Sequence, residues 1–213
     1  MSIPVLMITY NRLEYTKKAL AALLKSDCGT IYIIDNASTD GTIEYIKETA
    51  AFCEKHISCF FLNENTGIAG AMNIFLGLTF GEKFVSKVDN DTIVPPDFFT
   101  KMLACMAVCD IVQAKHYIIP ETDPLGWDHF ISTMPEIVPG LRKNHFVGGS
   151  GIVFRRDIVE KVPETKWMLG GWRQFQRERP ELIKAFFEKV EIKLLDEHGY
   201  SDYPDYYVKT KRL

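Results

Sequence analysis

The chain has 213 residues, of which 46% are hydrophobic and 25% are charged. These proportions exclude a disordered, collagen-like or coiled-coil chain, and the length allows one large domain or two small ones. With 25 basic and 28 acidic residues the formal net charge is −3, so no overall basic field attracts nucleic acid or an anionic membrane. The first apolar stretch, Ile3–Ile8, is too short for a membrane span and has no basic leader, so we expect a cytoplasmic protein.

The first half of the chain alternates apolar runs with stretches of helical periodicity, which is typical of an α/β protein with a largely parallel sheet. Asn11, followed by Glu14, predicts a capping box at the start of the first helix. The five cysteines include no Cys-x-x-Cys pair and predict reduced, mostly buried thiols. In chain order, the patterns predict strands at 3–8, 30–34, 58–62 and 84–88, each followed by a helix that begins near residues 11, 41, 69 and 96.

The second half of the chain is less regular. The segment from about residue 116 to 143 contains prolines at 120, 124, 135 and 139 and is expected to be irregular surface. A glycine-rich apolar run at 148–154 precedes a short helix at about 156–161. Apolar residues at helical spacing then predict a C-terminal amphipathic helix over 180–197.

Each of the four predicted strands ends in a set of polar residues. Ligands of open α/β proteins gather beyond the carboxyl ends of parallel strands, so these sets are expected to form one rim. Taken singly, each set is also explained by ordinary helix caps and turns. The sets are Thr9–Arg12, Asp35–Ser38, Asn63–Gly67 and Asp89–Asp91.

The pair Asp89 and Asp91 is the sharpest chemical signal in the sequence. Residues two apart in an extended chain point the same way, so two carboxylates would lie close together directly after a buried strand. Hard oxygen ligands on a short loop suit Mg²⁺ or Mn²⁺, which also bind the phosphates of a substrate. The alternative is an acidic turn in solvent, since Asp and Asn are common turn residues.

The order of these motifs resembles the family 2 glycosyltransferases of GT-A fold over about residues 3–110. The matching segments read Thr9-Tyr-Asn-Arg12, Ile34-Asp-Asn-Ala-Ser-Thr-Asp-Gly-Thr42, Asn65-Thr-Gly-Ile-Ala-Gly-Ala-Met-Asn73 and Asp89-Asn-Asp91. The resemblance implies a Rossmann-like, mostly parallel central sheet flanked by helices. It also implies a single domain over 1–213, with a nucleotide-sugar-binding half at 1–115 and an acceptor-side half with the C-terminal helix at 116–213.

The same resemblance implies roles for individual residues. Tyr10 would pack on the nucleotide base, and Asp35 would accept a hydrogen bond from its N3 atom. Asp91 would bind the metal, and Asp89 would contact the ribose or the metal. The implied nucleotide-sugar site consists of Thr9, Tyr10, Asn11, Arg12, Asp35, Asn36, Asn65, Gly67, Asn73, Asp89 and Asn90.

The acceptor side and a third metal ligand are also suggested. The run Gly148–Arg156 is similar to the glycine-rich acceptor-side segment of the family, which implicates Gly149 and Ser150. Trp172 is the best candidate for stacking on a sugar, ahead of Trp127 and Trp167, although large aromatics more often fill a core. His198 is a candidate third metal ligand, but a cation at a helix C-terminus explains it equally well.

The chain departs from the family pattern at two places. Met72 stands where the family often has an arginine, and Leu169–Gln174 contains no carboxylate where many members carry the catalytic base. If the reaction inverts configuration, the base has to come from elsewhere. The candidates are Asp128, Glu164, Glu178 and Glu181. Otherwise the enzyme retains configuration, or the protein is not a catalyst.

These observations predict a hexosyl- or pentosyltransferase that uses Mn²⁺ or Mg²⁺ and moves a sugar from a nucleotide-diphosphate donor, expected to be a UDP-sugar, to a hydroxyl acceptor. The acceptor could be a glycan, a lipid-linked carrier, a small molecule or modified DNA. Two alternatives are a catalytically degenerate nucleotide-sugar-binding protein and a sugar-1-phosphate nucleotidyltransferase. The latter would need a glycine-rich basic loop after the first strand, and Thr9–Arg12 is not one.

Overall fold

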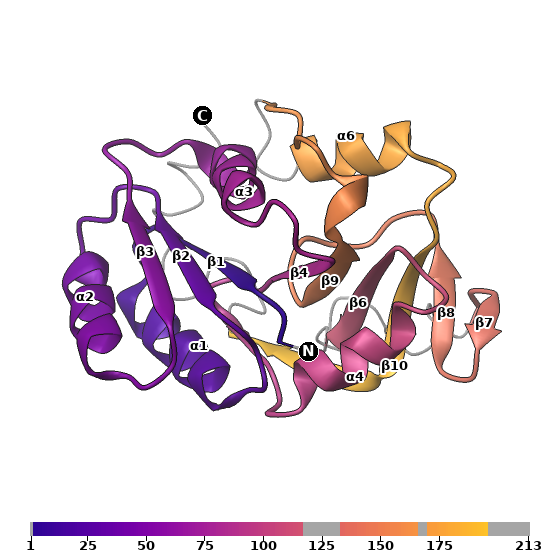
Figure 1. Ribbon diagram of the computed structural model, residues 1–213, viewed down its shortest axis with the longest axis horizontal. Coiled ribbons are helices and arrows are strands. Elements are labelled where there is room, and N and C mark those ends of the chain that lie inside the picture. Colours follow the sequence, from indigo (N-terminus) through magenta and orange to yellow (C-terminus); the bar gives the residue numbers. More distant parts are fainter. Residues whose placement is uncertain (1, 117–132, 166–169, 196–213) are drawn as a thin grey trace, which may run out of the picture.

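The computed structural model describes residues 2–116, 133–165 and 170–195, which form one ten-stranded mixed sheet with helices on both faces (Figure 1). The helices are α1 Leu13–Lys25, α2 Thr42–Phe52, α3 Gly67–Leu78, α4 Phe98–Cys105 and α6 Gly170–Glu178, with a short 3-10 helix at Arg156–Ile158. The strands are β1 Val5–Thr9, β2 Ile31–Asp35, β3 Ile57–Phe61, β4 Phe84–Lys87, β5 Thr92–Ile93, β6 Ile111–His116, β7 Glu136–Val138, β8 Leu141–Asn144, β9 Ile152–Arg155 and β10 Lys184–Leu194.

The strand order is β3-β2-β1-β4-β9-β6-β10-β8-β7, and β5 pairs separately with β10. Strands β3, β2, β1 and β4 are parallel, as the alternation of strands and helices in the sequence predicts. Strand β9 then runs antiparallel between β4 and β6, while β6 and β10 are parallel to each other. The predicted α/β class with a largely parallel central sheet is confirmed.

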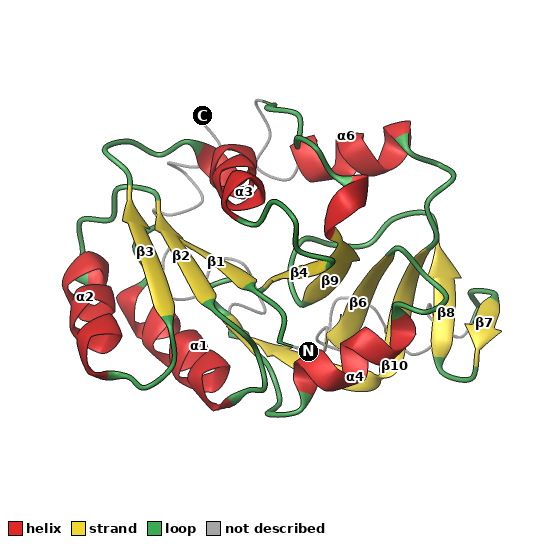
Figure 2. Ribbon diagram, in the orientation of Figure 1, coloured by secondary structure: helices red, strands yellow, loops and turns green. Residues whose placement is uncertain are grey.

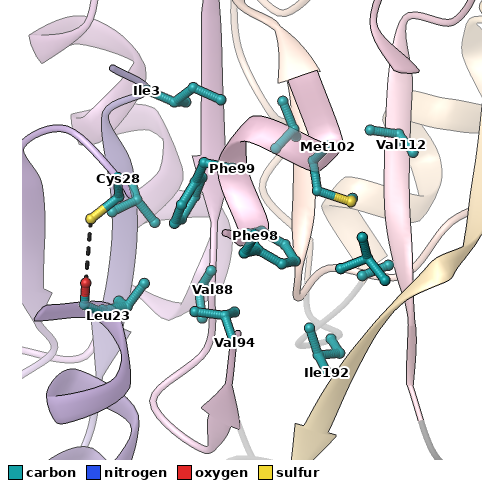
Figure 3. Close-up of a cluster of buried hydrophobic side chains, with 14 of the residues drawn as sticks. Ile3, Leu23, Cys28, Val88, Val94, Phe98, Phe99, Met102, Val112 and Ile192 are labelled. Atoms are coloured by element: carbon teal, nitrogen blue, oxygen red, sulfur yellow. Dashed lines mark hydrogen bonds between the residues drawn. The ribbon is translucent and has the colours of Figure 1, made fainter. Parts of the chain in front are cut away.

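Two hydrophobic cores lie on the two faces of the sheet, because successive side chains of a strand point to opposite faces. In β1, Val5 and Met7 enter one core, while Leu6 and Ile8 enter the other. Helices α1, α2 and α4 cover the first core, and α3 and α6 cover the second (Figure 2). Figure 3 shows Phe98 of α4 among the side chains of the first core. Both faces of the sheet are therefore covered by helices, and the edge where the strands end is the part left to bind a ligand.

The expected C-terminal amphipathic helix over 180–197 is wrong for the residues that the structure describes, because most of them form strand β10. The pairing of β10 with β6 shifts register between Phe187 and Glu191. Because of this irregularity Phe186 enters the second core while Val190, four residues on, enters the first, whereas residues four apart in a regular strand face the same side. Beyond Val190, buried and exposed residues alternate as in an ordinary strand.

Three smaller expectations also need correction. The segment expected to be irregular contains the β7–β8 hairpin. The short helix expected at 156–161 is only a 3-10 turn. Helix α1 has no capping box at Asn11: its first amide, on Leu13, donates to Asp40 Oδ2 of the neighbouring loop at 3.0 Å.

Among the residues that the structure describes, none of the helices has both the length and the hydrophobicity of a membrane span.

Candidate functional site

Asp35, the last residue of β2, joins the ends of the first two strands. Its side chain is fully buried. Oδ2 accepts hydrogen bonds from Thr9 Oγ1 at 2.7 Å and from Ser38 Oγ at 2.6 Å, and Oδ1 accepts one from the Ser38 amide at 2.7 Å. A buried carboxylate is tolerated only with such donors, so Asp35 fixes the end of β1 and the β2–α2 loop to each other.

The β1–α1 loop takes a left-handed backbone that costs energy for residues other than glycine. Asn11 has φ 54° and Arg12 has φ 66°. Two contacts with the β2–α2 loop hold this conformation: the Asn11 amide donates to Ser38 Oγ at 2.7 Å, and Asn11 Oδ1 accepts from the Thr39 amide at 2.8 Å. The strained turn therefore depends on the adjacent loop, which is a common property of functional sites.

Two asparagines connect the remaining strand ends to the loops described above. Asn36 Oδ1 accepts from the amide and the hydroxyl of Thr66, both at 3.1 Å, which joins β2 to the β3–α3 loop. Asn90 Nδ2 donates to Thr16 Oγ1 at 3.0 Å, which joins the turn after β4 to α1. The four polar sets therefore lie along one continuous edge of the sheet, as the sequence predicts.

Asp91 is held by a cation from this edge. Arg12 Nη1 lies 3.1 Å from Asp91 Oδ2, and the Arg12 side chain is 3% exposed while that of Asp91 is 19% exposed. The guanidinium also lies over the Tyr15 ring at 4.7 Å. Since the arginine is buried and the carboxylate reaches the surface, Arg12 orients Asp91 from the interior of the protein.

Asp89 has a second internal cation, Lys87, the last residue of β4. Lys87 Nζ forms an ion pair with Asp89 and donates to the Gly149 carbonyl at 2.7 Å, and its side chain is only 1% exposed. The Asp89 amide donates to Ser150 Oγ at 2.9 Å. The turn Asp89–Asp91, called the carboxylate turn below, is thus attached directly to the loop that contains Gly149 and Ser150. The resemblance assigns this loop to the acceptor side.

The two carboxylates supply the type of donor that a divalent cation prefers. Both are hard oxygen donors, two residues apart, and both reach the surface, Asp89 with 33% and Asp91 with 19% of the side chain exposed. No cluster of three or more His, Cys, Asp or Glu side chains occurs among the described residues. A cation bound here would therefore draw its other ligands from water and from substrate phosphates, which is usual for Mg²⁺.

Two predicted site residues have roles within the protein instead. Trp172 is 2% exposed, stacks on Phe175 with ring centroids 5.4 Å apart, and donates from Nε1 to the Gly148 carbonyl at 3.0 Å. The expectation that it stacks on a sugar is wrong, because a buried ring has no free face. Asn73 uses both ends of its amide on Val162, donating to its carbonyl at 3.0 Å and accepting from its amide at 2.7 Å.

The candidate bases are not gathered around the carboxylate turn by any contact among the described residues. Glu164 is exposed near Lys161, Glu178 accepts from Gln174 at 2.8 Å, and Glu181 pairs with Arg179. The hydrogen bond from Arg179 lowers the pKa of Glu181. Asp128, His198, Trp127 and Trp167 lie outside the described residues.

Lys87 is not among the site residues that the sequence predicts, although it stands within the predicted strand 84–88. A lysine in a strand buried on both faces is itself a signal, since lysine is almost never fully buried unless it is paired. The nearest carboxylate in sequence, Asp89, lies two residues away and is the partner.

A family assignment follows from comparison with known proteins. Residues 5–163 match the family model described as Glycosyl transferase family 2. EpsE of Bacillus subtilis (strain 168), which carries the name of a glycosyltransferase, is 23% identical over 193 residues, covering 88% of this chain and 67% of EpsE.

Solved structures show the same fold. The complex of S. aureus TarS with UDP is similar with a TM-score of 0.70 and 17% identity, covering 91% of this chain and 61% of that chain. The mannosyltransferase PcManGT from Pyrobaculum calidifontis, in complex with GDP-Man and Mn²⁺, has a TM-score of 0.74 and 18% identity, covering 93% of this chain and 58% of that chain. The chain thus spans about three fifths of these solved chains. With the motifs on one edge of a GT-A sheet and the family match over most of its length, the protein belongs to glycosyl transferase family 2.

Proposed function

We propose that this protein transfers a sugar from a UDP-sugar to a hydroxyl group of an acceptor, with Mn²⁺ or Mg²⁺ held by Asp91 and Asp89. The observation that carries the proposal is the hydrogen-bonded edge that runs from Asp35 through Thr9 and the β1–α1 loop to Asp91. Asp35 marks the end of this edge that is a candidate for binding the base, and Asp91 marks the end that is a candidate for binding the diphosphate. The UDP complex of TarS and the GDP-Man and Mn²⁺ complex of PcManGT, which share the fold, support both halves.

In this proposal the nucleotide lies across the ends of β1 and β2. Tyr10 is half-buried at the end of β1 and packs on the base. Asp35 Oδ1 accepts one hydrogen bond among the described residues, so it has a lone pair left to accept from the N3–H group of uracil once nucleotide binding uncovers this buried carboxylate. In this proposal residues 1–115 serve the donor, and residues 116–213 serve the acceptor.

The carboxylate turn serves the diphosphate. Arg12 orients Asp91, and Lys87 orients Asp89 while it holds Gly149 of the acceptor-side loop. When bound, the divalent ion supplies Lewis-acid stabilisation of the charge on the departing diphosphate. The general base of an inverting reaction stays a prediction among Asp128, Glu164, Glu178 and Glu181, and a cytoplasmic location likewise stays a prediction.

Release of nucleotide from a panel of UDP-sugars and GDP-mannose, with Mn²⁺ or with EDTA, tests this function. Asp91→Asn keeps the size of the side chain and removes its charge, so we expect activity to fall by at least about a hundredfold, roughly 2.7 kcal/mol on the rate scale. Asp157→Asn is the matched control, since Asp157 is exposed and pairs with Arg155 away from the turn. Activity that survives both EDTA and Asp91→Asn would refute the metal-dependent mechanism.

A catalytically inactive nucleotide-sugar-binding protein is the second candidate. It is favoured by the first turn of α6, where Gly170–Gln174 supplies no carboxylate at the place expected for a base. UDP binding without release of nucleotide from any donor, under conditions that keep the protein folded, would favour a binding protein over an enzyme. The family match leaves no support for the nucleotidyltransferase alternative.

A further inference from the structure

A cavity of about 430 Å³ lies between β8, α6 and the start of β10. These elements stand together at the end of the molecule away from β3 (Figure 1). Strand β10 begins at the cavity with Lys184, which pairs with Asn144 of β8. At its other end β10 reaches β5, beside the carboxylate turn. The cavity is therefore separate from the candidate donor site.

The lining of this cavity is cationic. Its basic side chains are Lys143, His145, Arg173, Arg177 and Lys184, and no aspartate or glutamate lines it. Arg173 lies over the Phe146 ring at 4.8 Å, which presents its guanidinium beside an apolar wall. The two acidic residues that follow on the chain are engaged elsewhere, Glu178 by Gln174 and Glu181 by Arg179.

Lys184 places a buried positive charge in the cavity wall. Its side chain is 2% exposed, and Nζ donates to the Gln176 carbonyl at 3.1 Å and to the Arg179 carbonyl at 2.8 Å. Burial lowers the pKa of this ammonium group. An ammonium has three donors, and within the described ranges no carboxylate forms an ion pair with it, although Glu181 and Asp110 lie near enough to raise its pKa. Burying a cation without an ion-pair partner is costly, and an anionic ligand would offset that cost.

We propose that the cavity binds a phosphate or carboxylate group carried by the acceptor, which rests on the transferase function proposed above. Helix α6 connects the two sites: Trp172 near its start holds Gly148, next to the Gly149 carbonyl that Lys87 contacts, and Arg177 near its end lines the cavity. A helix of 9 residues is about 13 Å long, so an extended acceptor could reach both. The net charge of −3 argues for this local site over general attraction of nucleic acid.

The test compares anion binding by the full chain and two doubly substituted variants. Arg173→Gln with Arg177→Gln removes two exposed cations of the cavity, while Lys18→Gln with Lys25→Gln removes two exposed cations of α1 and matches the change in net charge. Tripolyphosphate and trigalacturonate are titrated calorimetrically, with neutral maltotriose and a single-stranded hexanucleotide alongside. We call the first protein the α6 variant and the second the α1 variant. We expect both small anions to bind at least about tenfold more weakly to the α6 variant and with unchanged affinity to the α1 variant.

UDP is titrated separately, and its affinity is expected to be the same in both variants, which keeps this inference distinguishable from the donor site. In transfer assays the α6 variant should raise KM for uronate-bearing acceptors and leave kcat for neutral ones unchanged. Equal anion affinity in the wild type and the α6 variant, an equal loss in both variants, or competition by UDP would overturn the proposal. Tightest binding of the hexanucleotide, lost in the α6 variant, would overturn the acceptor assignment in favour of nucleic acid.

Discussion

At the scale of single residues, each carboxylate of the turn after β4 is balanced by a cation from the same chain. Lys87 balances Asp89, and Arg12 balances Asp91. Both cations are almost completely buried while both carboxylates reach the surface. Burying a charge is costly without a partner, so the pairs fix the turn in one conformation before any ligand binds.

Lys87→Met tests the first of these pairs. The variant keeps the length of the side chain and removes its charge, and we expect it to lower the free energy of unfolding by about 1 to 3 kcal/mol, because Asp89 loses its partner but can be partly hydrated. Chemical denaturation measures the change. Lys83→Met, at an exposed lysine before the same strand, is the matched control and should be within about 0.5 kcal/mol of wild type. A Lys87→Met protein as stable as the control would contradict the pairing.

Asp35 offers a second test at this scale. Asp35→Ala leaves Thr9 Oγ1 and both Ser38 donors without their acceptor, so we expect a loss of about 1 to 3 kcal/mol in unfolding free energy. UDP affinity should fall by a similar amount, as measured by calorimetry. Thr9→Val removes one donor but keeps the carboxylate, so it should affect UDP binding much less. Unchanged UDP affinity in Asp35→Ala would remove Asp35 from the site.

At the scale of elements, the C-terminal end of α4 and the turn that follows it make the free energy of unfolding depend on pH in the alkaline range. Burial raises the pKa of Cys105 to about 11 and that of Cys109 to about 12, from an ordinary value of 9.0. The unfolded chain therefore releases these protons first, and the stability that the neutral thiols contribute is present below pH 9 and lost as pH rises toward 11 to 12. Between those limits each thiol lowers the unfolding free energy by about 1.4 kcal/mol per pH unit.

The check is denaturant unfolding of the wild type and of Cys105→Ala with Cys109→Ala at several pH values from 8 to 11. The variant starts from lower stability, because two buried sulfurs are removed, but its stability should fall less steeply with pH. Parallel curves for the two proteins would show that these thiols do not titrate as buried groups.

Elements whose pattern is purely local were predictable from the sequence. Strands β1 and β2 are apolar up to their last residues because helices cover both faces of the sheet, and the polar residues at their ends locate the edge that carries the candidate site. Strand β10 was not predictable, because its register shift is set by pairing with β6 and interrupts the alternation of buried and exposed residues that identifies a strand. The cap of α1 was equally hidden, because it comes from Asp40, which is distant in sequence.

The sequence predicts where the candidate site lies on the sheet, but it predicts less well which contacts its residues make. Motif order placed Asp35 and Asp91 on one edge, and the structure brings their loops together. Whether a polar side chain is already satisfied inside the protein depends on tertiary neighbours. Sequence alone therefore could not show that Asn73 holds Val162, or that the Trp172 ring is buried.

At the scale of the whole molecule, the sheet joins two chemically different ends. The parallel part carries the edge with Asp35 and Asp91, and the mixed part carries the basic cavity beside Lys184. Strand β10 spans both, since it begins at the cavity and ends against β5 after the carboxylate turn. This arrangement agrees with the proposed division into a donor half and an acceptor half.

The most direct test of the central claim, that this edge binds a nucleotide diphosphate, is calorimetric titration of UDP into the full chain with Mn²⁺ present. We predict one site per chain, with affinity reduced at least about tenfold by Asp91→Asn, since a charge-assisted contact is lost, and unaffected by Asp157→Asn. Absence of UDP binding by the folded wild-type protein, or equal affinity in the wild type and Asp91→Asn, would contradict the account.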